Sequence, residues 1–144
     1  MPQRNKPILL IVKNPTDANN IRFSLDAIGV KNPLVHLNNG EEALIYLKNP
    51  SNIKPWLILF GLDSHSSDGL NFLRVIKTDS LLKIIPVIII AESYENQKII
   101  QGFELGIAGY IIKPRNASKI TNAIGTIMDY WNLSELPPTG VEVP

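Results

Sequence analysis

The most constraining feature of this sequence is an unbroken apolar run, Trp56 to Phe60, which a polar loop and an amphipathic segment follow. An apolar run of this length has no polar face, so it predicts a central strand covered on both sides. After the loop from Gly61 to Asp68, apolar residues recur at helical spacing through Ile76. In open α/β sheets, ligands and chemistry collect beyond the carboxyl ends of such strands. A functional site is therefore expected around Gly61.

Length and composition limit the classes of protein that the chain can belong to. With 144 residues, 44% hydrophobic and 19% charged, it has the balance of one globular domain. A net charge of +1 favours neither nucleic acid nor anionic lipid as a partner. The absence of cysteine excludes disulfides, thiolate catalysis and zinc–thiolate sites. The first apolar run, Ile8 to Val12, is too short for a signal peptide or a membrane span, so the expected compartment is the cytoplasm.

The periodicity of the chain predicts a strand followed by a helix, five times over. Strands are expected at 7–12, 34–37, 56–60, 87–91 and 108–112, each followed by a helical pattern. This alternation predicts a single α/β three-layer domain with a parallel sheet, and five strands fit the flavodoxin-like order 2-1-3-4-5. The domain is expected over residues 7–131, between an N-terminal extension, 1–6, and a proline-rich tail, 132–144, that we expect to be poorly ordered.

The first helix illustrates how the boundaries and buried faces are predicted. Asn14 suits an N-cap and the proline after it suits the first helical position. Ile21, Phe23, Leu25 and Ile28 are expected to share one broad, buried side.

Several short stretches of the chain together resemble one family. They are Ile8–Val12, Asn14–Pro15, Asn39–Leu44, Asp68–Leu70, Ile85–Ile89, Phe103–Gly106, Tyr110–Pro114 and Asp129–Trp131. With these stretches the chain resembles the receiver domain of bacterial two-component response regulators, the CheY-like family. It is most similar to the small single-domain, phytochrome-associated type. The resemblance covers roughly residues 7 to 131.

The departures from the family pattern fall on the residues that carry its chemistry. The family's phosphoacceptor carboxylate is here Gly61, which has no side chain and cannot be a nucleophile. The family's acidic pair, which holds magnesium, is here Val12 and Lys13, and these offer a hard cation no oxygen ligand. The family's switch Thr or Ser is here Ala91. The resemblance therefore implies a pseudo-receiver that takes no phosphoryl group by the family mechanism.

Lys113, Pro114 and the aromatic Tyr110 are retained. The resemblance implies a cis bond between Lys113 and Pro114. Because Ala91 leaves room beneath it, Tyr110 is expected to lie inward in the resting state.

The predicted function is signalling by protein–protein contact, with no enzymatic activity, no cofactor and no metal. The expected partners are a histidine kinase, a phytochrome-like sensor or a downstream regulator, and a homodimer through the last two strand–helix units is a further option. Tyr130 and Trp131 are candidates for such an interface, because aromatic side chains are costly to leave in water.

Three alternatives stay open, and the third, a DNA-binding regulator, is disfavoured by the near-neutral charge and by the absence of a second domain. The first is a phosphorylatable receiver that uses Asp63, although two residues of loop displace a carboxylate by about 6 Å, far more than the ~0.5 Å that catalysis tolerates. The second is a small-anion or nucleotide-binding flavodoxin-like module, in which Lys13 and Lys113 would share an anion. Against the anion site, Asp63 or Glu92 could neutralise one lysine instead.

Other polar residues near the expected site are assigned structural roles. Asp17 and Glu92 are expected to be helix-start residues or salt-bridge partners. His36 is expected to be a packed or edge residue, and His65 a loop residue without a catalytic role.

Overall fold

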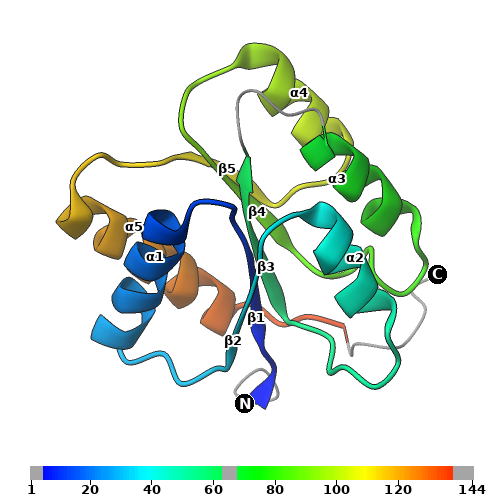
Figure 1. Ribbon diagram of the computed structural model, residues 1–144, viewed down its shortest axis with the longest axis horizontal. Coiled ribbons are helices and arrows are strands. Elements are labelled where there is room, and N and C mark those ends of the chain that lie inside the picture. Colours follow the sequence, from blue (N-terminus) through cyan, green and yellow to red (C-terminus); the bar gives the residue numbers. More distant parts are fainter. Residues whose placement is uncertain (1–4, 63–67, 138–144) are drawn as a thin grey trace.

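The structure is a computed structural model that describes residues 5–62 and 68–137. Strands and helices alternate along the chain. The strands are β1 (Ile8–Ile11), β2 (Leu34–Leu37), β3 (Leu57–Leu62), β4 (Val87–Ala91) and β5 (Gly109–Ile112). The helices are α1 (Pro15–Ala27), α2 (Gly40–Lys48), α3 (Asp68–Thr78), α4 (Asn96–Glu104) and α5 (Ala117–Leu133). All strand pairs are parallel and the order is β2-β1-β3-β4-β5, which confirms the predicted flavodoxin-like topology (Figure 1).

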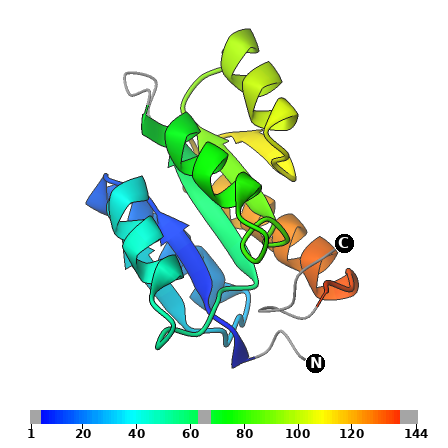
Figure 2. The ribbon, with the colours of Figure 1, turned by 90° about the vertical axis from the view of Figure 1, so that its right-hand side faces the viewer.

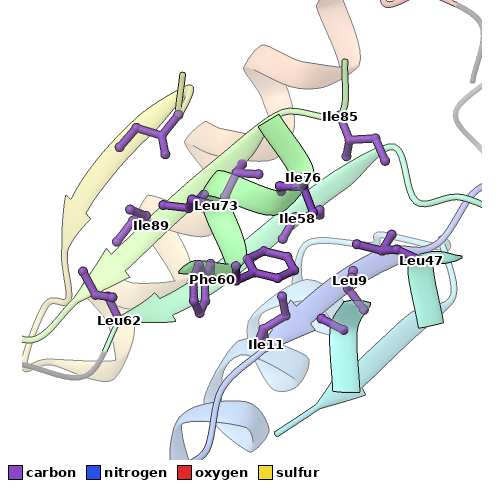
Figure 3. Close-up of a cluster of buried hydrophobic side chains, with 14 of the residues drawn as sticks. Leu9, Ile11, Leu47, Ile58, Phe60, Leu62, Leu73, Ile76, Ile85 and Ile89 are labelled. Carbon is purple, nitrogen blue, oxygen red and sulfur yellow. The ribbon is translucent and has the colours of Figure 1, made fainter. Parts of the chain in front are cut away.

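The sheet separates two hydrophobic cores. Helices α1 and α5 cover one face, while α2, α3 and α4 cover the other (Figure 1). Successive residues of a strand point to opposite faces, so Ile58, Phe60 and Leu62 of β3 enter the α2–α3–α4 core (Figure 3). Leu57 and Leu59 enter the core beneath α1 and α5. The two-sided burial predicted for this strand is therefore confirmed.

Strand β3 is longer at its carboxyl end than the sequence pattern predicts. The apolar run ends at Phe60, but the strand continues to Leu62, and Gly61 pairs with Ile90 of β4. Trp56 lies just before the strand and is 1% exposed. Gly61 is thus held within the sheet and does not begin the loop, because β4 supplies backbone partners that hydrophobic periodicity cannot reveal.

The predicted buried side of α1 is only partly correct. Ile21 and Leu25 are buried, but Phe23 is 71% exposed and Ile28, the residue after the helix, is 38% exposed. Phe23 comes two positions after Ile21, so it lies about 200° around the helix axis and faces away from the sheet. The face against the sheet is completed by small residues, Ala18 and Ser24.

Asn116 is the N-cap residue of helix α5, and its Oδ1 accepts a hydrogen bond from Ser118 N at 2.8 Å. The helix ends two residues beyond the predicted domain boundary. Trp131 packs against the α1–α5 core, whereas Tyr130 is largely exposed. Their rings meet edge to face with centroids 4.9 Å apart. Leu136, the one tail residue seen against the core in the described range, belongs to the same cluster as Trp131. Most of the predicted tail, 138–144, lies outside the described residues.

None of the helices in the two described ranges is long and apolar enough to cross a membrane.

Candidate functional site

The residues predicted to form the site lie where β1, β3, β4 and β5 end. Ile11 pairs with Phe60, so Val12 follows β1 beside Gly61 of β3. Ala91 is the last residue of β4 and pairs with Ile112, which Lys113 follows. The sheet thus brings all four positions to one edge, as parallel strands require.

Val12 occupies the space that a side chain at position 61 would need. A Cβ atom on Gly61 would lie 2.6 Å from Val12 Cγ1 and 3.3 Å from the carbonyl oxygen of Ile11. Contacts below 3.0 Å are essentially never seen for a real Cβ atom. Val12 is itself buried, within the core beneath α1 and α5. The position of the family's acceptor is therefore filled by an isopropyl group from the neighbouring strand.

Ala91 lies at the switch position and is buried. Its carbonyl oxygen accepts a hydrogen bond of 2.7 Å from Lys113 N, which joins the ends of β4 and β5. The side chain is a methyl group that packs into the α2–α3–α4 core. It offers no hydroxyl group to a ligand in the crevice.

Lys113 is held by two carboxylates. Its Nζ donates to Asp17 Oδ1 at 3.0 Å and lies 3.5 Å from Glu92 Oε1. Burial by itself lowers the pKa of Lys113, but the hydrogen bond and charge of Asp17, with a smaller contribution from Glu92, outweigh it. The net result is a pKa above the ordinary value of 10.5. The ammonium group is therefore charged and paired.

The pairing was only partly predicted. Glu92 is one of the two acids expected to neutralise a lysine, and the structure confirms it. Asp63, the other, lies outside the described residues, as does His65. The nearer partner is Asp17, which sequence reasoning treats only as a helix-start or salt-bridge residue in general. Its place in the first turn of a helix that starts at this edge of the sheet is the signal that could have identified it.

The Lys113–Pro114 bond is not cis, which corrects the expectation from the family. The described residues contain no cis peptide bond. A trans bond is the intrinsically preferred form before proline.

Lys13 does not join Lys113. It is exposed and lines a groove of about 470 Å³ above the α2–α3 side of the sheet. Phe60, Leu62 and Phe72 are among the apolar residues of this groove, and α2 and α3 lie side by side there (Figure 2). Val12 belongs to the core beneath α1 and α5, so the two residues that follow β1 lie on opposite sides of the sheet. The two lysines predicted to share an anion thus line different cavities, and Lys113 is paired with carboxylates.

Tyr110 lies inward. It packs against the α2–α3–α4 core and its hydroxyl oxygen is buried, with no hydrogen-bond partner among the residues that the structure describes. Burial raises the pKa of Tyr110, and the charge of Glu95 raises it further. The phenol is therefore neutral at physiological pH and is held by packing.

His36 is a structural residue, as expected. Its Nε2 lies 2.9 Å from the carbonyl oxygen of Val12, so the ring joins β2 to the chain leaving β1. This contact fixes the backbone of a residue at the edge of the site.

The donor set does not suit the divalent cation that the family implies. The two positions that would supply carboxylates carry an isopropyl and an ammonium group, and a hard cation needs several oxygen ligands. Over residues 5–62 and 68–137, no cluster of three or more His, Cys, Asp or Glu side chains could hold a metal. No chemical step is therefore assigned to a metal here.

The five-stranded order and the lysine at the end of β5 define a receiver-type flavodoxin-like domain. No protein-family model matches the chain. It is 28% identical over 130 residues to the response regulator Rcp1 of Synechocystis sp., with 88% of each chain covered. The crystal structure of the phosphorylated cyanobacterial phytochrome response regulator RcpA is 30% identical, with a TM-score of 0.85, covering 93% of this chain and 99% of that one. The Mn²⁺-bound form of Rcp1 is 28% identical, with a TM-score of 0.83, covering 92% and 99%.

The chain therefore belongs to the receiver domains of two-component response regulators.

Proposed function

We propose that this chain is a pseudo-receiver: it signals through protein–protein contact and takes no phosphoryl group at position 61. The observation that carries the proposal is the contact of Val12 with the Cα side of Gly61, where a Cβ atom would meet Val12 Cγ1 at 2.6 Å. The acceptor is not merely missing, because its space is used by the hydrophobic core. Phosphoryl transfer needs a positioned nucleophile and cationic neutralisation of the developing charge. Gly61 supplies no nucleophile, and Lys113 is already engaged by Asp17 and Glu92.

The likeness to phytochrome response regulators supports a sensor histidine kinase or phytochrome-like protein as the partner class. A receiver that cannot gain free energy from a phosphoryl group would bind such a partner in one conformation. Its output would then follow its own concentration or that of the partner. The cytoplasmic location remains a prediction of the same proposal.

Intact-mass spectrometry after incubation with acetyl phosphate and Mg²⁺ tests the proposal. We expect no mass gain from this chain under conditions in which RcpA gains one phosphate. A matched control is the variant Val12→Asp/Lys13→Asp/Gly61→Asp, which rebuilds the family's carboxylates on the same fold. A magnesium-dependent gain of one phosphate on the unaltered chain, mapped to this edge of the sheet, would contradict the proposal.

A second candidate is a phosphorylatable receiver with a non-standard acceptor. It is favoured by the relatives, since RcpA has been crystallised phosphorylated and Rcp1 with Mn²⁺. In this chain the acceptor would be Asp63, which lies outside the described residues. Peptide mapping of the acetyl phosphate reaction distinguishes the two, because only this candidate places a phosphate on that aspartate, and Asp63→Asn would abolish it.

The remaining alternative is a small-anion or nucleotide module. The separation of Lys13 from Lys113 argues against a shared anion. Titration of sulfate, phosphate and a flavin nucleotide against thermal stability tests it, since a ligand that binds the folded state raises the melting temperature.

A further inference from the structure

We infer that Lys113, Asp17 and Glu92 form an ion-pair lock that fixes the segment between β4 and α4 and thereby keeps Tyr110 inward without a phosphoryl group. The inference rests on the proposed function in one respect: no phosphoryl group competes for Lys113.

Three elements meet at the lock. Asp17 belongs to the first turn of α1, Glu92 follows β4, and Lys113 follows β5. The backbone adds to the contact, because Lys113 N donates to Ala91 O at 2.7 Å, directly before Glu92. Lys113 thus holds the exit of β4 by its amide and, through Glu92, by its ammonium group.

The two arms of the lock differ in strength. The Asp17 and Lys113 side chains are 20% and 28% exposed, and they border a narrow apolar cavity between α1 and α5. The Glu92 side chain is 64% exposed and lies at 3.5 Å. Exposed pairs are strongly screened by water and salt, whereas partly buried ones are screened less. Lys113 is therefore anchored to α1, and the Glu92 arm is the one that can open.

The segment that begins with Glu92 follows β4, the strand whose Ile89 pairs with Tyr110, and it runs to the start of α4. Glu95 is the N-cap residue of α4, but its side chain makes no capping hydrogen bond. Instead its carboxylate lies 3.2 Å from Lys98 Nζ, and its charge raises the pKa of Tyr110. The Tyr110 hydroxyl has no hydrogen bond to another described residue, so its inward position depends on the groups packed around it. In our inference the Glu92–Lys113 pair holds the start of residues 92–95, and these residues in turn limit the outward movement of Tyr110.

Amide exchange by NMR tests the lock at both of its ends. Lys113 N, bonded to Ala91 O, reports on the exit of β4, and Ile99 N, bonded to Glu95 O, reports on the start of α4. In Glu92→Gln we expect both amides to exchange about two- to fivefold faster, as the loss of an exposed pair implies. In Asp17→Asn we expect at least a tenfold effect on Lys113, about the value of a hydrogen bond to a charged group. The amide of Ile58, bonded to Pro86 O in the sheet, should not change.

The environment of Tyr110 is followed in the same samples by ¹⁹F NMR of 3-fluorotyrosine-labelled protein, assigned with Tyr110→Phe. Its resonance should shift toward the exposed position in Glu92→Gln, and 1 M NaCl should shift the unaltered protein the same way. Glu41→Gln is the control, because it removes one exposed acid at the start of α2.

The lock is overturned if Glu92→Gln and Glu41→Gln show the same exchange rate at the amide of Ile99, or the same ¹⁹F resonance of Tyr110. This holds whatever the result for Asp17→Asn. All measurements use unphosphorylated protein. Detection of a phosphate on the chain would therefore refute the proposed function without deciding the lock.

Discussion

Replacing Gly61 by alanine tests the contact on which the proposed function depends. Gly61 is not among the described glycines with positive φ, so alanine can adopt its backbone conformation. If no new contact were made, alanine would stabilise the fold by about 0.4–1 kcal/mol, because it lowers the conformational entropy of the unfolded chain. The new methyl group would meet Val12 Cγ1 at 2.6 Å and Ile11 O at 3.3 Å. Overpacking of this kind costs about 1–3 kcal/mol.

The clash cannot be relieved cheaply. Val12 is β-branched, so few side-chain rotamers are available to it, and it is 6% exposed. Strand β1 is paired on both sides, with β2 and β3, which opposes a backbone shift. We therefore expect Gly61→Ala to destabilise the protein by up to about 2.6 kcal/mol, which is the cost of the clash minus the gain from the unfolded chain.

A double-mutant cycle with Val12→Ala isolates the contact. Val12→Ala alone should cost about 1.5–3 kcal/mol for two buried methyl groups and the cavity they leave. In that background Gly61→Ala should be neutral or stabilising, which gives a coupling energy of about 1–3 kcal/mol.

Urea unfolding followed by tryptophan fluorescence measures all four proteins, because Trp56 is fully buried. The midpoint should change with an unchanged m-value. An equal loss of stability from Gly61→Ala in both backgrounds would refute the packing of Val12 on Gly61.

Three further changes follow from other contacts. Ser24→Ala should cost about 1 kcal/mol in urea unfolding, because buried Ser24 Oγ shares a 2.9 Å hydrogen bond with Thr121 Oγ1 between α1 and α5; an unchanged midpoint would show that this bond is not stabilising. Burial lowers the pKa of Lys77 to about 8. Between pH 8 and the ordinary value of 10.5, the unfolded state therefore binds more protons than the folded state. The free energy of unfolding should rise with pH over this range, by up to about 3 kcal/mol. The variant Lys77→Met should lack this rise. Identical profiles of stability against pH for the variant and the unaltered protein would contradict the prediction. Asn39→Ala should cost about 1 kcal/mol, since Asn39 Oδ1 caps Glu42 N at 2.9 Å in α2, whereas Asn38→Ala should have little effect.

The fold class and the chemistry that is missing from the site both follow from the residues alone. Strict alternation of apolar strands with amphipathic helices permits few topologies, and the observed order is the expected one. A glycine, a valine and an alanine cannot acquire a carboxylate or a hydroxyl group by folding. The pseudo-receiver prediction therefore depends on the identity of these residues and not on their arrangement in space.

What occupies the site instead depends on tertiary structure. The contact of Val12 with Gly61 requires the register of β1 with β3, and the choice of Asp17 as the nearer partner of Lys113 depends on where α1 crosses the sheet. Tertiary packing also sends Phe23 to the surface and Lys13 to the opposite face from Val12. The two contacts join residues that are distant in the chain, and the two orientations depend on how one element is rotated against another. Local periodicity specifies neither of these.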